Sequence, residues 1–284
     1  MAAALVSGPE ATFLGGCADG RIISYRTTGE TEHVPGASHS NFISGLASSP
    51  KNENIYSIGY DDRVREVQVK PSPSFTSTAQ STAAQPKSIA VSGDGTVFVA
   101  EVNVVEGFRD SQRVLNHTPK FTPSAIAAFE SFVAIGGEDQ KVRLNRWDGL
   151  ALAEMAVLEG NKGVVSALAF SPDGKLLAAG DSTGRVALFD VQEKKLITSR
   201  WSFHSARINS LAWTPDSLHC ASASLDTHVY VWSVAKPMKN IAIKNAAPGG
   251  ANAVLWLEGE GYPQTLASTG ADGCVRLWKV NFHV

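Results

Sequence analysis

Two histidines are the side chains in this sequence best suited to acid–base chemistry or metal binding, because an imidazole titrates near neutral pH and is a common zinc ligand. Each begins the same polar series at the same intervals, which reads His39, Ser57, Asp61 and then His204, Ser222, Asp226. A series that recurs with constant spacing is typical of a repeated structural unit. We therefore interpret both histidines as structural rather than as a base or a metal ligand.

The remaining sequence contains no motif of a known type of active site. It has no GxSxG, no P-loop lysine after a glycine-rich loop, no HExxH and no GxGxxG that opens a helix. Residues 15–20 could form a phosphate-binding loop, but a hairpin turn is the favoured interpretation. His219 and His228 lack the neighbouring cysteines or carboxylates of a zinc site. We expect no catalytic residue, no cofactor and no metal.

The segment from His204 to Val234 predicts the elements that position the second series. It contains three short runs of alternating apolar residues, separated by turn residues such as those at 214–216. This pattern predicts three antiparallel strands of a half-buried sheet. The segment resembles a WD repeat, whose hydrogen-bonded positions correspond to His204, Ser222, Asp226 and Trp232.

Copies of this unit recur along the whole chain. The start of its first strand, at residues 211–216, recurs clearly at 46, 89 and 168, and weaker copies begin at 4, 126 and 254. The starts near residues 4, 46, 89, 126, 168, 211 and 254 are spaced by roughly 42 residues, as in WD repeats. The sequence therefore predicts an all-β fold, a seven-bladed WD40-type β-propeller that occupies residues 1–284 as a single domain.

The hydrogen-bonding positions are filled unevenly in the other repeats. Repeat five has Thr183 where the aspartate is expected, so we expect its network to be absent or rewired. Repeat two has Val67 instead of tryptophan, and repeat seven lacks an evident histidine. The remaining positions predict networks through His39, Ser57 and Asp61 in repeat two and through Ser268, Asp272 and Trp278 in repeat seven. Residues 71–86, rich in Ser, Thr, Ala and Pro, read as an outer strand and a loop, with a domain boundary as the alternative.

The two ends of the chain suggest an open seam in the ring. Six residues follow Trp278, so the last blade is expected to lack its outer strand. The first repeat begins directly on an inner strand near Ala4. We expect either that the chain is incomplete at its N-terminus or that another segment covers the unpaired edge, since such an edge promotes aggregation.

Composition narrows the class of partner and the compartment. The formal net charge of −2 and the absence of a basic cluster argue against nucleic-acid binding. No signal peptide and no apolar run of membrane-spanning length is present, which predicts a protein without a membrane partner. Three scattered cysteines predict reduced thiols in a cytoplasmic protein.

The second half of the chain shows a more specific resemblance. The stretches 136–142, 164–191 and 204–234, with residues 206–213 and 229–232 as the closest echoes, resemble the C-terminal propeller of the actin-interacting protein one family. Members of this family carry two seven-bladed propellers, and this chain has residues for one. The resemblance implies a non-catalytic protein of the actin cytoskeleton that binds actin filaments decorated with cofilin and promotes their disassembly.

One face of the propeller should carry the loops that lead into the inner strands together with the turns that hold the aspartates. We call it the Asp-turn face, and we expect a protein partner to contact it through Arg63, Glu138, Asp139, Lys141, Lys162, Arg207, Asp226 and His228. Charges of both signs on this face suit a protein better than a polyanion. Two alternatives stay open: a generic WD-repeat scaffold or substrate receptor of another complex, and an enzyme built on a propeller.

Overall fold

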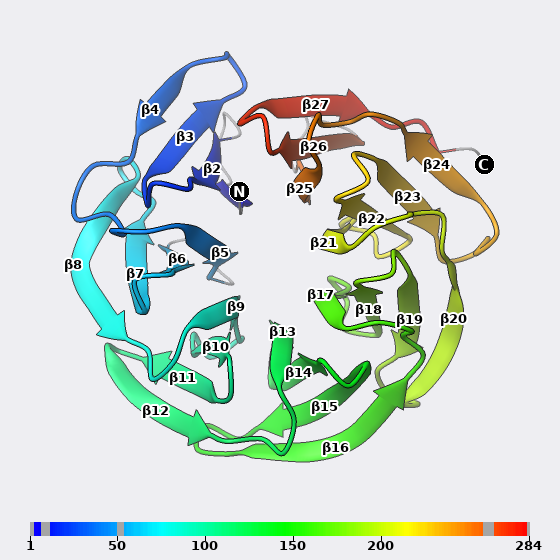
Figure 1. Cartoon of the computed structure of the whole chain (residues 1–284), viewed down its shortest axis with the longest axis horizontal. Helices are drawn as coiled ribbons and strands as arrows, with labels where there is room; N and C mark the ends of the chain where they lie inside the picture. Colours follow the sequence, from blue (N-terminus) through cyan, green and yellow to red (C-terminus); the bar gives the residue numbers. More distant parts are fainter. Residues whose placement is uncertain (1–2, 7–11, 50–53, 258–263, 283–284) are drawn as a thin grey trace.

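Seven antiparallel β-sheets form a ring in this computed structural model, seen along its short axis in Figure 1. The structure describes residues 3–6, 12–49, 54–257 and 264–282. The first strand of each sheet lies at the centre of the ring and the later strands lie progressively further out. This arrangement confirms the predicted seven-bladed β-propeller.

Each blade uses consecutive strands, numbered in chain order from the inside to the outside. Blade 1 contains β1 (Ala3–Val6), β2 (Thr12–Gly16), β3 (Ile22–Arg26) and β4 (Thr31–His33). Blade 2 contains β5 (Ile43–Ser48), β6 (Asn54–Gly59), β7 (Arg63–Gln68) and β8 (Ser74–Ser81). Blade 3 contains β9 (Pro86–Val91), β10 (Val97–Glu101), β11 (Val105–Arg109) and β12 (Gln112–His117). Blade 4 contains β13 (Pro123–Phe129), β14 (Phe132–Gly137), β15 (Lys141–Trp147) and β16 (Leu152–Glu159). Blade 5 contains β17 (Val165–Phe170), β18 (Leu176–Asp181), β19 (Val186–Asp190) and β20 (Lys195–Trp201). Blade 6 contains β21 (Ile208–Trp213), β22 (His219–Ser224), β23 (Val229–Ser233) and β24 (Asn240–Ile243). Blade 7 contains β25 (Ala251–Trp256), β26 (Thr265–Gly270) and β27 (Val275–Lys279).

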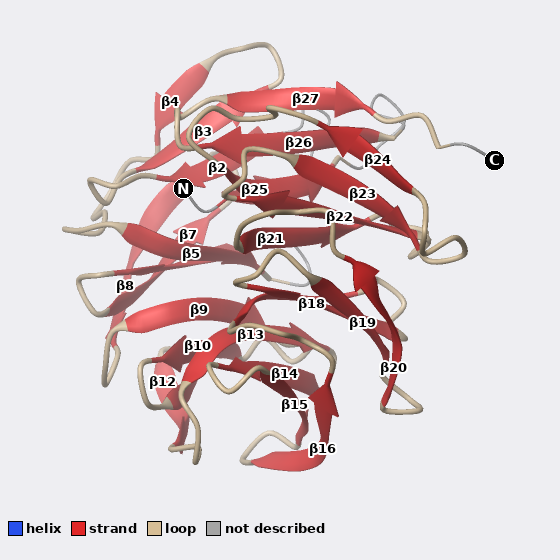
Figure 2. Ribbon diagram, turned by 45° about the vertical axis from the view of Figure 1, so that its right-hand side comes forward, coloured by secondary structure: helices blue, strands red, loops and turns tan. Residues whose placement is uncertain are grey.

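The seven repeat starts predicted from the sequence each fall within an inner strand. The Ser- and Thr-rich residues 71–86 supply β8, which pairs with β7 as the outer strand of blade 2. In the described residues blade 7 has three strands, as predicted. The chain then continues past β27 toward blade 6, where the Phe282 ring stacks on His219 at 3.9 Å between centroids. No helix in the described part of the chain is long and apolar enough to cross a lipid bilayer, and Figure 2 shows strands and loops.

The core lies between the blades, because each sheet packs both of its faces against neighbouring sheets. In β23 the four consecutive residues from Val229 to Trp232 are all buried, a pattern that arises where side chains on both faces of a strand are covered. Between blades 5 and 6 the packed side chains include Leu188, Trp201 and Trp213. Between blades 7 and 1 the described buried cluster consists of Phe13, Leu257 and Ala267.

A belt of polar side chains links the inner strands around the central channel. Its members occupy the second position of successive inner strands and are Ser44, Lys87, Ser124, Ser166, Asn209 and Asn252. Each of the first five donates a hydrogen bond to the first residue of the next inner strand, with distances of 3.2, 3.2, 2.6, 2.6 and 3.0 Å to the carbonyl oxygens of Pro86, Pro123, Val165, Ile208 and Ala251. We call these six residues the polar belt.

Each belt residue is the extra residue of a β-bulge. The register of the inner strands of blades 2–7 shifts at this point, for example between Val165 and Ala167 in β17 and between Ile208 and Ser210 in β21. A bulged residue has no partner in its own ladder and leaves the regular alternation of sides. Five of the belt side chains therefore reach the neighbouring blade, and Ser44, Ser124 and Ser166 also bond a carbonyl of their own blade.

Replacing Ser166 by alanine tests whether the belt stabilises the ring. The variant loses the 2.6 Å bond to the Ile208 carbonyl between blades 5 and 6, so we expect the free energy of unfolding to fall by about 1 kcal/mol in urea denaturation. Ser202→Ala, at an exposed serine near the same blades, is the control and should leave it unchanged. An equal effect of the two substitutions would contradict a stabilising role for the belt.

Candidate binding face

A chain of hydrogen bonds connects four buried groups in blade 6. The His204 ring lies 2.9 Å from the Asp226 carboxylate through Nδ1 and 2.8 Å from the Ser222 hydroxyl through Nε2. The Trp232 indole donates to the same hydroxyl at 2.8 Å. A neutral imidazole satisfies every partner, because Nδ1–H donates to Asp226 and Nε2 accepts from Ser222.

The electrostatics of this network favour that neutral ring. Burial lowers the pKa of His204 and outweighs the negative charge of Asp226, which by itself would raise that pKa. Burial alone would raise the pKa of Asp226, but hydrogen bonds from the Ser205 and His228 amides and the nearby His204 ring hold it below its usual range. The carboxylate is therefore charged at neutral pH and fixes the ring in one orientation.

Serine, histidine and aspartate in this order also form the nucleophilic triads of hydrolases. Here the Ser222 residue is 0 % exposed, and its oxygen already accepts the hydrogen bond from Trp232. A substrate therefore cannot reach the hydroxyl. The arrangement joins two strands, β22 and β23, to the turn between them and to the loop before β21, and the hydroxyl is closed to a substrate.

Blade 2 repeats the arrangement and blade 5 rewires it. His39 lies 2.7 Å from Asp61 and 2.9 Å from Ser57, with Val67 in place of the indole. In blade 5 the carboxylate comes from Asp181 at the end of β18, where it accepts bonds from the Lys162 amide at 2.9 Å and the Thr183 hydroxyl at 2.6 Å. The loop before the inner strand is thus fixed to the same turn by a different residue.

Blade 7 departs from the prediction at one residue. Trp278 donates to Ser268 at 2.8 Å as expected, but Asp272 does not join them. Its carboxylate pairs with Arg276 at 2.5 Å instead, because no histidine lies between it and the serine. Blade 4 shows the same substitute, in which Asp139 pairs with Arg143 at 2.6 Å.

Backbone bonds show that the inner-strand loops and the aspartate turns share one face. The amide of Tyr60 donates to Phe42 at 2.8 Å, that of Ser182 to Val164 at 2.9 Å, and that of Leu225 to Arg207 at 3.0 Å. Each bond ties the loop that leads into an inner strand to the turn between the second and third strands of the same blade. These contacts make the Asp-turn face a rigid platform.

Internal contacts engage five of the eight residues predicted to meet a partner. The side chain of Asp226 is 6 % exposed and bonded to His204, so it has little surface left for a partner. The exposed charges at Glu138, Asp139 and Lys141 pair with Lys87, Arg143 and Glu159. The ring of His228 accepts a bond from the Asn245 amide at 3.3 Å. Among the described residues, Arg63, Lys162 and Arg207 are exposed and make no ion pair.

A cavity of about 370 Å³ opens at the centre of this face, at the mouth of the channel. Its lining contains the whole polar belt, Arg207, and the aromatic side chains of Phe42 and Tyr60. Of the predicted contact residues only Arg207 borders this cavity. The sequence interpretation missed the two aromatic residues and the belt, although belt positions lie two residues before the repeat starts.

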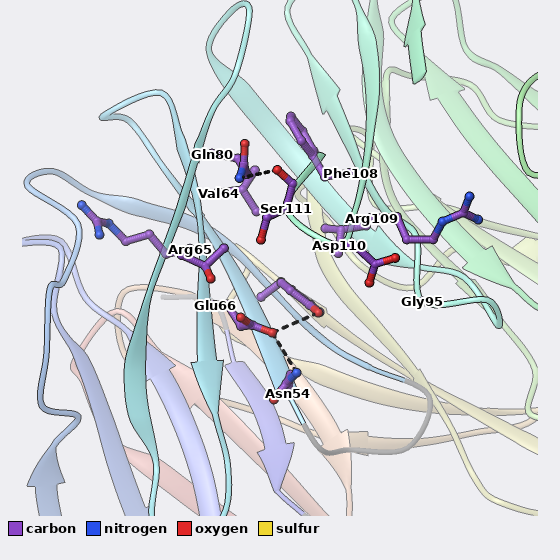
Figure 3. Close-up of a pocket in the computed structure, with 13 residues that line it drawn as sticks. Asn54, Val64, Arg65, Glu66, Gln80, Gly95, Phe108, Arg109, Asp110 and Ser111 are labelled. Carbon is purple, nitrogen blue, oxygen red and sulfur yellow. Dashed lines mark hydrogen bonds between the residues drawn. The ribbon is translucent and has the colours of Figure 1, made fainter. Parts of the chain in front are cut away.

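A second hollow of about 200 Å³ lies between blades 2 and 3 (Figure 3). Its polar groups are largely engaged with one another. Glu66 accepts hydrogen bonds from Asn54 at 2.8 Å and Tyr56 at 3.3 Å, and Gln80 donates to the Ser111 carbonyl at 2.8 Å. In the described part of the chain no cluster of three or more His, Cys, Asp or Glu side chains could hold a metal ion. The channel mouth is therefore the better candidate site.

Comparison with known proteins gives related chains over nearly the whole sequence. The chain is 33 % identical over 269 residues to the 66 kDa stress protein of Physarum polycephalum, covering 93 % of this chain and 44 % of that protein. It is 33 % identical over 281 residues to Actin-interacting protein 1 of Drosophila melanogaster, covering 97 % and 45 %. It is 29 % identical over 274 residues to Actin-interacting protein 1 of Caenorhabditis elegans, covering 93 % and 44 %.

A model of the Anaphase-promoting complex subunit 4 WD40 domain also matches residues 130–216. The chain spans about half the length of the curated relatives it matches. The relatives extend across all seven blades, including those whose networks differ from the WD pattern. The chain belongs to the WD-repeat family of the actin-interacting protein 1 proteins.

Proposed function

We propose that this chain is a non-catalytic regulator of the cytoplasmic actin cytoskeleton, which binds actin filaments decorated with cofilin and promotes their disassembly. The observation that carries the proposal is the similarity to Actin-interacting protein 1 of two animals along 93–97 % of the chain. The rigid Asp-turn face, with its exposed cations and central cavity, supports binding to a protein. We further propose that the chain corresponds to the C-terminal propeller of these relatives.

Co-sedimentation with actin filaments, with and without cofilin, tests this proposal. We expect the chain to pellet with filaments when cofilin is present and to increase the actin left in the supernatant. Pelleting without release would assign binding, but not disassembly, to this chain. A folded sample that neither pellets nor releases actin would contradict the proposal.

A scaffold or substrate receptor in another complex is the second candidate. The match of residues 130–216 to a WD40 domain of the anaphase-promoting complex favours it, because this match is to a subunit of an assembly. The two candidates differ in what the immobilised chain captures. A regulator of actin should retain actin and cofilin, whereas a scaffold should retain the subunits of another complex in their place.

A further inference from the structure

The channel mouth on the Asp-turn face has unused hydrogen-bond donors. Most belt side chains already donate to the next blade, as described above. Ser88 and Ser210, each directly after a belt residue, accept bonds from the amides of Ile126 at 3.1 Å and Val254 at 3.3 Å. Their hydroxyl protons have no acceptor among the described residues, and both serines line the same cavity as Arg207. These groups suit an acceptor such as a carboxylate.

The charges around the mouth point to an acidic ligand. Internal bonds already engage most aspartates of the surrounding turns, at Asp19, Asp61, Asp139, Asp181, Asp226 and Asp272. The cations Arg63, Lys162 and Arg207 are exposed and make no ion pair within the described residues. Asp62 is an exposed carboxylate on this face and is followed directly by Arg63. The uncompensated charge is thus predominantly positive, and Arg207 carries it at the cavity itself.

An aromatic pair supplies apolar surface at the same mouth. The rings of Phe42 and Tyr60 lie 5.2 Å apart at 57°, and Tyr60 is 46 % exposed. A backbone hydrogen bond of 2.8 Å joins the two residues and holds the pair in place. Tyrosine and arginine are the residue types that most often dominate binding energy at protein interfaces. Because both border one cavity, a single segment can contact both.

We propose that the mouth of the central channel binds an acidic segment of a protein partner, with a carboxylate on Arg207 and an apolar side chain on the Phe42–Tyr60 pair. A protein segment is favoured over a nucleic acid because isolated cations and a net charge of −2 provide no continuous track for a phosphate backbone. In the proposed function this segment belongs to the filament or its bound cofilin, and in that respect the inference rests on the proposed function.

Selection of a phage-displayed library of random octapeptides on the full chain tests the surface without filaments. We expect enrichment of peptides that place aspartate or glutamate next to an aromatic or aliphatic residue. An enriched peptide is then labelled with fluorescein and titrated by anisotropy. Arg207→Ala and Tyr60→Ala should each weaken its binding at least about tenfold. Arg185→Ala, at an exposed arginine of the same face that does not line the cavity, should change it less than about twofold.

Three results would overturn the inference. The first is a library that yields no acidic consensus. The second is an enriched peptide whose affinity does not depend on Arg207 or Tyr60. The third is Arg207-dependent binding of a labelled 20-nucleotide single strand without peptide enrichment, which would assign the mouth to a polyanion. Circular dichroism of each variant checks folding, and the exposure of both side chains makes loss of the fold unexpected.

Filament co-sedimentation of the same variants separates this inference from the proposed function. If the wild-type chain pellets and Arg207→Ala and Tyr60→Ala do not, the mouth is the contact surface. If all three pellet equally, the inference fails while the proposed function stands. If the wild-type chain does not pellet, the proposed function fails, and the peptide selection alone decides whether the mouth recognises acidic segments.

Discussion

Replacement of Trp232 by alanine should lower the free energy of unfolding by about 3–5 kcal/mol, the largest effect we expect from a single substitution. The indole is fully buried and stacks on Trp201 with centroids 5.7 Å apart. Its removal opens a cavity between blades 5 and 6 and takes from Ser222 the hydrogen bond that orients the hydroxyl toward His204. Urea denaturation followed by circular dichroism measures the loss.

Two further variants separate the packing of Trp232 from its hydrogen bond. Trp232→Phe keeps most of the buried volume and loses the indole N–H, so it should cost about 1–2 kcal/mol. Trp278→Ala removes an indole that makes the same 2.8 Å bond to Ser268 but is only partly buried, so it should cost less than Trp232→Ala. Equal losses for the two alanine variants would show that burial of Trp232 is not the dominant contribution.

The resemblance to a WD repeat allowed the blade 6 network to be predicted, because His204, Ser222, Asp226 and Trp232 lie at the four positions that such repeats link by hydrogen bonds. The same reasoning failed for Asp272. The repeat position predicts where the carboxylate lies, but it does not predict which cation is nearest to that carboxylate. Without a histidine in the preceding loop, Arg276 on β27 is within reach and neutralises the charge. Arg143 does the same for Asp139 in blade 4.

The polar belt is visible in the sequence as a residue two positions before the starts of repeats two to seven, yet the direction of its side chains could not be predicted. Alternation of apolar and polar residues assigns side chains to faces only where the strand is regular. Each belt residue lies in a bulge, which adds one residue and changes the direction of the side chain. The channel mouth therefore emerges only once the register of the inner strands is known.

Blade 3 carries a different buried network, and it predicts a pH dependence of stability. Glu101 at the end of β10 and Glu106 on β11 hold the loop before β9, because their carboxyl groups accept hydrogen bonds from the Ala84 and Ala83 amides. Both residues are 0 % exposed. Burial, the hydrogen bond to Glu106 and the charge of Glu106 raise the pKa of Glu101 to about 8. The Arg113 guanidinium lies 2.8 Å from the Glu106 carboxyl group. Glu101 therefore holds a proton at neutral pH in the folded state.

The sign of the dependence follows from the proton that the folded state retains. Between the pKa of an unfolded glutamate, about 4.3, and about 8, the folded chain binds one proton more than the unfolded chain. The contribution of Glu101 to stability is complete below this window and is lost as the pH rises through it. Glu101→Gln has no such proton, so the variant should gain stability relative to the wild type as the pH rises from 5 to 8.

Glutamine suits this test because it can keep both contacts of the protonated carboxyl. Its oxygen can accept the bond that the Ala84 amide makes to Glu101 at 2.5 Å, and its amide can donate to Glu106. The buried histidines titrate in both proteins, so their contribution cancels in the difference between the two stability curves. Glu154→Gln, at an exposed glutamate of β16, should give a curve parallel to that of the wild type. The prediction is contradicted if the difference in the free energy of unfolding between Glu101→Gln and the wild type stays constant with pH. In that case Glu101 holds no proton beside Glu106, and Arg113 alone must stabilise the blade 3 pair.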